Sequence, residues 1–212
     1  MNFPGEELWA DALEALDADP LQELIESAGA VLLRGCRWDL AGFEAFTQRL
    51  CDRFHAVGTR VRLRQPGDGY TSEVFRDNFT LLGHSEGTYR PWPPPPEVCF
   101  FGCITPPSAD GGETVVIDGV AFARALSADL RARFSETGIC YESHWDRDRW
   151  HAEFGVADTP ALNALLRDFP GVRYSVEGET LHLLYTTEAL VPTPSGERAF
   201  ANGVLAHLPR IA

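Results

Sequence analysis

The sequence predicts a mixed α/β fold, organised as a single domain over residues 1–212. Three observations predict it. Segments with apolar residues at helical spacing alternate with short apolar runs of strand length. The chain has 212 residues, enough to bury one sizeable core. Its hydrophobic content of 44%, with 11% aromatic residues, is typical of a globular protein and not of a disordered one.

The N-terminal part predicts three helices around one strand. Residues 6–16 carry leucines at helical intervals, and Asp19-Pro20 offers an N-cap and a first-turn proline for a second short helix that Gly29 ends. Residues 30–33 form an apolar strand. Asp39 then caps a helix with a stripe of phenylalanines, which is typical of core packing.

The middle of the chain predicts a pocket rim followed by a strand. Residues 58–69 are rich in Arg and Gly, and we expect a flexible rim there. Arg60, Arg62 and Arg64 alternate on one face of an edge strand, where they would bind a substrate carboxylate or simply keep the edge solvated; the pattern favours the second. Further on, a proline run leads into an apolar strand at residues 98–103.

The C-terminal half predicts helices and strands in alternation, each bounded by a cap or turn signal. His144 and His151 flank a charged segment with two tryptophans, and such a pair is usually structural. The expected elements are helices from residues 118 to 126, 127 to 138 and 158 to 166, a strand at 139–143, a hairpin of 172–176 with 180–186, and a turn at 192–197.

Charge excludes two classes of partner. The formal net charge is −13, from 31 acidic and 18 basic residues. Such a surface repels phosphate backbones and anionic lipids, so we expect neither nucleic acid nor a membrane as partner. The N-terminus has no secretory signal pattern, and no window reaches a membrane-spanning length. The sequence therefore predicts a cytoplasmic protein.

The five cysteines support the same compartment. They are odd in number, stand in apolar surroundings and contain no C-x-x-C pair. Their pattern is typical of reduced core thiols in a cytosolic protein, not of a disulfide framework or a zinc site.

A candidate metal pair lies at His84-Ser85-Glu86. In an extended strand, residues two apart project from the same face, so both side chains would reach one cation. An imidazole nitrogen and a carboxylate oxygen with open positions left over suit Fe(II), and a second His would complete a facial triad. The alternative is a hydrogen-bonded histidine beside a solvated carboxylate, and the tripeptide alone favours this alternative.

The surroundings of the pair strengthen the metal interpretation. After it come Tyr89, the prolines 93–96, the apolar run 98–103, and Gly111-Gly112-Glu113-Thr114 leading into 115–118. This order resembles the taurine dioxygenase-like family of Fe(II)/2-oxoglutarate oxygenases. The H-x-E form is similar to that of its clavaminate synthase and amino-acid hydroxylase branch, and the Gly-Gly-Glu-Thr turn is the more specific half of the match.

The resemblance implies roles for three residues. His84 and Glu86 would be iron ligands, and Thr114 would hydrogen-bond the 2-oxoglutarate co-substrate. The alternative for Thr114 is a β-branched residue that opens a strand. The implied fold is a double-stranded β-helix, or jelly roll, with flanking helices.

The C-terminal end departs from the family pattern. The resemblance implies a distal iron-binding His and, after it, an Arg for 2-oxoglutarate on late strands, and nothing here matches that block. His207 comes too early after Asn202, and Arg210 follows it too closely. We therefore expect a jelly roll incomplete at its C-terminus. The sequence leaves three accounts open: a fragment of a longer oxygenase, strands supplied by another chain, or a shortened non-catalytic relative.

The resemblance implies an Fe(II)-dependent oxygenase with 2-oxoglutarate and O₂ as co-substrates. It would hydroxylate an amino-acid-like small molecule of specialised metabolism, free or bound to a carrier protein. One rival is a non-catalytic subunit that needs a partner chain, and another is a cupin-like metalloenzyme that uses no 2-oxoglutarate. The sequence does not decide between a monomer, a homo-oligomer and a hetero-oligomer.

Overall fold

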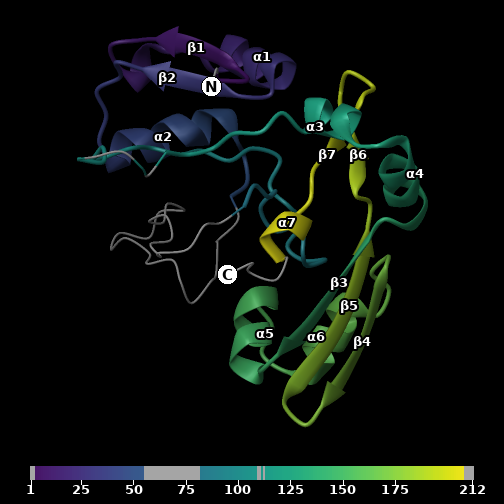
Figure 1. Cartoon of the computed structure of the whole chain (residues 1–212). Coiled ribbons are helices and arrows are strands. Elements are labelled where there is room, and N and C mark those ends of the chain that lie inside the picture. Colours follow the sequence, from purple (N-terminus) through teal and green to yellow (C-terminus); the bar gives the residue numbers. More distant parts are fainter. Residues whose placement is uncertain (1–2, 55–81, 109–110, 112, 208–212) are drawn as a thin grey trace. The chain divides into compact units, whose positions relative to one another are not determined.

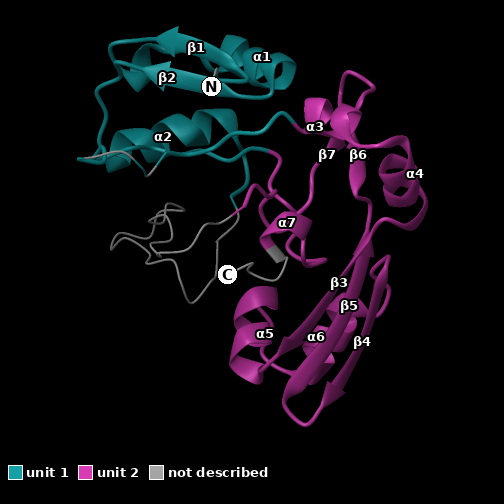
Figure 2. Ribbon diagram, in the orientation of Figure 1, with its two compact units in different colours: residues 1–56, 63–74, 98–118 teal, residues 57–62, 75–97, 119–212 magenta. Residues whose placement is uncertain are grey.

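The computed structural model describes residues 3–54, 82–108, 111 and 113–207, which form helices interspersed with short strands (Figure 1). The prediction of a mixed α/β fold is confirmed. The chain divides into two compact units: residues 1–56, 63–74 and 98–118, and residues 57–62, 75–97 and 119–212 (Figure 2). The single-domain prediction stays a prediction. The expected pocket rim at 58–69, with Arg60, Arg62 and Arg64, lies outside the described residues.

The first unit pairs two short strands in parallel and packs helices on them. The strands β1 (Glu6–Trp9) and β2 (Val31–Arg34) align Glu6 with Val31 and Trp9 with Arg34. The helical prediction for residues 6–16 is wrong, because pairing with a strand some 25 residues away overrides a weak local periodicity. Only a 3₁₀ turn follows. The helical elements are η1 (Leu13–Ala15), α1 (Ala18–Ala28) and α2 (Leu40–Leu50).

Local signals place the ends of these helices. The Asp39 carboxylate accepts a hydrogen bond from the Gly42 amide at 2.7 Å, as the predicted N-cap of α2 requires. Gly29 ends α1 in the left-handed conformation, also as predicted. That helix begins at Ala18 with Asp17 at the N-cap position, so the N-cap prediction for Asp19 is wrong, whereas Pro20 lies in the first turn as predicted. Leu13, Leu21 and Phe46 form the buried centre of this unit.

The predicted strand at 98–103 is not formed, and neither is the strand that Thr114 would open in the alternative prediction for that residue. Residues 98–103 and 115–117 have no regular structure, and within the described ranges no strand pairs with either segment. Several of their apolar side chains are consequently exposed, by 61% at Phe101 and 73% at Val115. The prediction of core thiols is wrong for Cys99, Cys103 and also Cys140 in the second unit, because all three are exposed. All five cysteines are described, and none forms a disulfide.

The second unit contains the elements predicted for the C-terminal half. Its central sheet has the strand order β3-β5-β4 and is antiparallel throughout. Helix α4 begins at its predicted cap, Ser127; the sequence also places Leu130 on the inward face of this helix, and that prediction is wrong because Leu130 is exposed. The elements are α3 (Gly119–Ala125), α4 (Ala128–Thr137), β3 (Ile139–Trp145), α5 (Arg147–Phe154), α6 (Thr159–Leu166), β4 (Val172–Glu177), β5 (Thr180–Thr187), β6 (Leu190–Pro192), β7 (Arg198–Phe200) and α7 (Val204–His207).

One face of this sheet builds the core. Leu181 and Leu183 of β5 are at most 1% exposed, and they pack with Trp145 of β3 and with side chains of α5 and α6. The two helices lie beside the sheet in Figure 1. His182 alternates with the two leucines and belongs to the opposite face, as its position in the sequence predicts.

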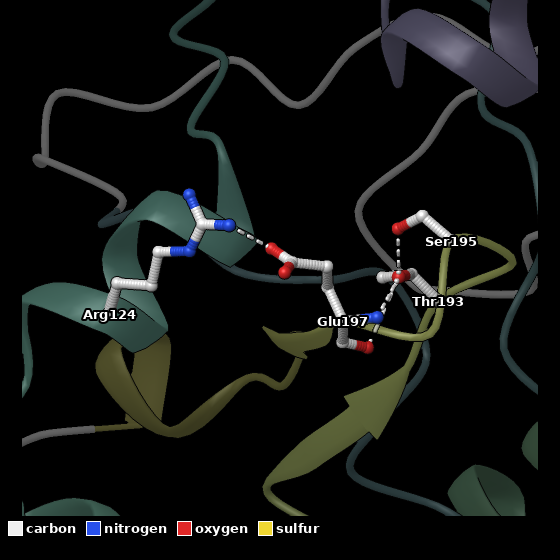
Figure 3. Close-up of polar contacts among 4 residues, drawn as sticks. All are labelled: Arg124, Thr193, Ser195 and Glu197. Atoms are coloured by element: carbon white, nitrogen blue, oxygen red, sulfur yellow. Dashed lines mark hydrogen bonds and ion pairs between the residues drawn. The ribbon is translucent and has the colours of Figure 1, made fainter.

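The β6–β7 hairpin carries the chain toward residue 202. Its turn is closed by Thr193, whose hydroxyl donates to the Glu197 carbonyl and accepts from the Glu197 amide, both at 3.1 Å (Figure 3). The Glu197 carboxylate in turn pairs with Arg124 of α3. Phe200 of β7 packs on Phe122 of α3, with ring centroids 4.9 Å apart. These contacts fix the hairpin to α3.

Among the described residues, no helix is long and apolar enough to cross a bilayer.

Candidate metal centre

His84 and Glu86 lie next to each other, on a turn instead of a strand. Residues 82–85 have no regular structure, and Glu86 opens a turn that runs to residue 89. The predicted strand is therefore wrong, yet the His84 Nε2 and Glu86 Oε1 atoms are only 3.4 Å apart. Both side chains are partly buried, with 24% and 30% of their surfaces exposed. The two donor atoms converge although the backbone is not extended.

A backbone contact determines which nitrogen of His84 carries the hydrogen in the neutral ring. Its Nδ1 lies 2.9 Å from the Leu82 carbonyl oxygen. Because a carbonyl oxygen only accepts, Nδ1 carries the hydrogen, and in the neutral ring the lone pair is then on Nε2. That lone pair is on the atom beside the Glu86 carboxylate. A second-shell carbonyl that fixes the ring in this way is the usual support of a metal-bound histidine.

The chemistry of this donor pair suits iron. One imidazole nitrogen and one carboxylate oxygen match two positions of a facial triad for Fe(II). When both ring nitrogens are protonated, His84 forms an ion pair with Glu86 instead, so a proton competes with a metal for Nε2. Within the part of the chain that the structure describes, no group of three His, Cys, Asp or Glu side chains is placed to hold a metal.

A second His–Glu pair, on β3, shows that a short distance between the two side chains does not by itself identify a metal site. On β3, His144 Nε2 lies 3.3 Å from Glu142 Oε1, but these side chains are 57% and 69% exposed. The His144 ring stands 4.5 Å from that of His182 across the sheet. Together with Arg173 and Ser175, they line an open hollow of about 270 Å³ on the outer face of the sheet. His144 is thus mostly exposed to solvent, and the prediction that it is structural stays a prediction.

The turn after His84 is held by hydrogen bonds to two buried residues. The Ser85 amide donates to the Asn202 carbonyl at 3.0 Å, and the Thr88 hydroxyl donates to the Ser85 carbonyl at 3.1 Å. Gly87, with φ of +70°, makes the reversal between them. Thr88 and Asn202 are 8% and 3% exposed. The backbone that carries both candidate ligands is thus bonded at each end of its turn.

Asn202 is itself fixed by its side chain. Its amide group donates to the Ala189 carbonyl at 3.0 Å, and its Oδ1 accepts from the Val204 amide at 3.1 Å. The next amide, of Gly203, donates to the buried Tyr141 hydroxyl at 2.8 Å. Sequence reasoning noted the segment that ends at Asn202 but gave this residue no role. A single Asn in an otherwise apolar stretch is the signal that would have indicated one.

A buried ion pair lies next in the chain, and the sequence did not predict it. Arg90 is 6% exposed and pairs through Nη1 with the carboxylate of Glu153, which is also 6% exposed. The two residues are 63 positions apart. A signal was available in α5, because Trp150, Glu153 and Phe154 share one helical face and a carboxylate on that face lies among buried aromatic rings.

Tyr89 gives a pH-dependent prediction. Burial raises the pKa of its phenol above the ordinary value; the Arg90 guanidinium acts against this rise, and the Glu153 carboxylate adds to it. The folded state therefore keeps a proton that the unfolded chain loses near pH 10. The stability contributed by the protonated Tyr89 phenol is fully present below about pH 10. It falls as the pH rises from there toward the pKa of Tyr89 in the folded state. Urea unfolding between pH 9 and 11.5 should show a shallower alkaline loss in Tyr89→Phe than in wild type. Parallel losses in both would contradict the assignment, and Tyr185→Phe controls for removal of a hydroxyl elsewhere.

Thr114 belongs to the other compact unit. It is exposed and lies in a segment without regular structure, so the alternative prediction, that it opens a strand, is wrong. Its proposed role toward 2-oxoglutarate stays a prediction. His207 closes α7, which comes directly after the Asn202 segment.

A helix-covered sheet unit with a supported His–Glu donor pair defines a candidate mononuclear metalloprotein. Residues 5–203 match the family model described as "Taurine catabolism dioxygenase TauD, TfdA family". The chain therefore belongs to the TauD/TfdA family, a family of Fe(II)/2-oxoglutarate-dependent dioxygenases, and the predicted resemblance is confirmed. No curated protein matches the chain.

Proposed function

We propose that this chain is an Fe(II)- and 2-oxoglutarate-dependent oxygenase whose iron is held by His84 and Glu86. One observation supports this most strongly. His84 Nε2, whose lone pair is set by the Nδ1 contact to Leu82, stands 3.4 Å from Glu86 Oε1 in a chain of the TauD/TfdA family. A solvated histidine beside a carboxylate would have no need of a fixed tautomer or of a turn that is hydrogen-bonded to two buried residues.

The residues have separate tasks in this proposal. Fe(II), when bound, supplies oxidation of a substrate by O₂ coupled to decarboxylation of 2-oxoglutarate. His84 and Glu86 donate one nitrogen and one oxygen to the metal. The Leu82 carbonyl keeps the imidazole in one tautomer and orientation. The Asn202 carbonyl holds the Ser85 amide, so the backbone between the two ligands keeps its shape. By the family resemblance, Thr114 hydrogen-bonds the co-substrate.

The proposal includes the jelly-roll fold of the family. The described residues contain sheets of two, three and two strands, and these do not make up a double-stranded β-helix. The exposed apolar segments at 98–103 and 115–117 support strands that are completed by further pairing. A third ligand would then come from outside the described residues or from another chain.

The substrate class that we propose rests on the resemblance of His84-Ser85-Glu86 to the H-x-E branch of the family. We propose an amino-acid-like small molecule, free or on a carrier protein, oxidised in the cytoplasm. The acidic balance of 31 to 18 charged residues supports a partner that is neither nucleic acid nor an anionic membrane.

Turnover tests the proposal. The purified chain is given Fe(II), 2-oxoglutarate, O₂ and a panel of free amino acids, and succinate formation is followed. We expect succinate that requires both iron and 2-oxoglutarate, that is lost in His84→Ala, and that persists in Glu142→Ala, which removes the exposed His–Glu pair. Iron-dependent oxidation without 2-oxoglutarate would favour the cupin-like rival. A folded chain without turnover, whose cellular role survives His84→Ala, would favour a non-catalytic subunit.

A further inference from the structure

Four buried polar residues of the second unit gather around the turn at residues 85–91. Thr88 and Asn202 bond Ser85, and Arg90 pairs with Glu153. Pro91, which follows Arg90, is among the most completely buried side chains. Buried polar groups are costly unless they are bonded, so their concentration at one turn needs a reason. The partly buried His84–Glu86 donor pair lies on that turn.

The Arg90–Glu153 contact joins the turn to helix α5 at two points. The Arg90 Nη1 donates to the Glu153 carboxylate and also lies 3.4 Å from the Glu153 backbone carbonyl. This carbonyl is among the last of α5, which ends at Phe154, so it has no partner within the helix. The Arg90 guanidinium donates a hydrogen bond to this terminal carbonyl and lies at the negative end of the helix dipole. Arg90 thus fixes its own turn to the end of a helix that packs in the core.

Tyr89 strengthens the same attachment. Its ring meets Trp145 edge-on, with centroids 6.4 Å apart, and the Arg90 guanidinium lies 5.6 Å from the centre of the Tyr89 ring. Tyr89 also packs against two of the hydrophobic clusters of the unit. Shortly after Glu86, the chain is therefore held in place both by the Tyr89 ring and by the Arg90 guanidinium.

Stability does not explain why the anchor is charged. Removing two charges from water is expensive, and apolar residues of similar volume commonly replace such a pair without loss. The buried Arg90 Nε adds to the cost, because no described residue accepts a hydrogen bond from it. What an ion pair adds over apolar packing is a defined geometry, since a guanidinium and a carboxylate satisfy each other in few orientations.

We propose that Arg90 and Glu153 are positioning residues for the metal pair: they fix the turn so that the Glu86 carboxylate stays beside His84 Nε2. This inference rests on the proposed function and deepens it. It assigns to α5, through Glu153, a role in metal binding that neither the motif nor the family match specifies.

The test separates positioning from stability with a double variant. Arg90→Met/Glu153→Leu replaces the pair by apolar side chains of similar volume. We expect its urea midpoint to lie close to that of wild type, whereas Arg90→Met or Glu153→Leu alone leaves one buried charge and lowers the midpoint strongly. Anaerobic Fe(II) binding and hydrogen exchange of the Ser85 amide are then measured on the folded double variant. Glu179→Gln is the matched control, because it removes the exposed ion pair that Arg147 of α5 makes at 3.0 Å.

The inference predicts that the double variant binds Fe(II) about tenfold or more weakly, the effect typical of lost second-shell support. Its Ser85 amide should exchange faster while amides of β5 stay protected, as in a local opening. Wild-type iron affinity in the folded double variant would overturn the inference and leave the proposed function standing. A wild-type chain that binds no iron would overturn the proposed function instead. In that case the hydrogen-exchange rate of the Ser85 amide still tests the positioning role. A rate that is the same in the double variant as in wild type refutes that role.

Discussion

Replacing Glu86 by alanine is expected to weaken Fe(II) binding by more than about 100-fold while the chain stays folded. Loss of a second-shell residue typically weakens metal binding by about 10–100-fold, and removal of a ligand should exceed that. The fold should tolerate the change, because Glu86 is 30% exposed and its contact with His84 is that of a partly solvated pair. Such pairs contribute about 0–1 kcal/mol to stability. Anaerobic equilibrium dialysis gives the affinity, and urea unfolding gives the stability.

The chain contains its own matched control for this experiment. Glu142 stands 3.3 Å from His144, nearly the same separation as in the candidate site, but on an exposed sheet face. Glu142→Ala should leave iron binding unchanged. Equal losses of iron affinity in both variants would indicate nonspecific binding to surface carboxylates. Unfolding of Glu86→Ala would show that Glu86 is structural, which contradicts its assignment as a ligand.

Gly171→Ala is expected to destabilise the second unit by more than about 3 kcal/mol. Gly171 has φ of +74°, and a Cβ there would lie 2.1 Å from the Thr186 carbonyl oxygen. The left-handed conformation alone costs a non-glycine residue about 1–2 kcal/mol, and the overlap with a backbone atom adds to that. The clash falls on β5, whose Thr186 amide donates to the Gly171 carbonyl at 2.8 Å. Relief would require the start of β4 to move away from the sheet.

Gly178→Ala separates the two contributions. Gly178 forms the β4–β5 turn with φ of +62°, and nothing lies within 4 Å of a Cβ built there. It should therefore cost only the conformational term, about 1–2 kcal/mol. Urea unfolding of both variants, followed by the fluorescence of the buried Trp145 and Trp150, measures the difference. Equal destabilisation would show that the sheet relaxes around Gly171 without cost.

Short-range signals predicted most of the second unit. Ser127 and Asp158 cap their helices as expected, because a capping bond needs only the residue and the amide three positions on. The β4–β5 hairpin followed from two apolar runs separated by a short glycine turn. The alternation of Leu181, His182 and Leu183 also gave the buried face of β5 correctly.

Features that depend on distant partners were not predicted. Residues 6–9 became a strand because β2 pairs with them, and local spacing carries no information about that partner. Residues 98–103 read as a strand because they are apolar, but a strand also requires a neighbour, which the described residues do not provide. The His84–Glu86 pair was found for its residue types, although its expected backbone was wrong. The support that we propose for it from Asn202, Arg90 and Glu153 depends on contacts between residues far apart in the sequence.

The most direct test of the iron assignment is an anaerobic titration of the chain with Fe(II) and 2-oxoglutarate, followed by the visible charge-transfer band of the chelate. We expect a saturable band that is lost in His84→Ala and Glu86→Ala and retained in Glu142→Ala. Absence of the band from demonstrably folded wild-type protein would contradict the claim that this chain assembles the cofactor site.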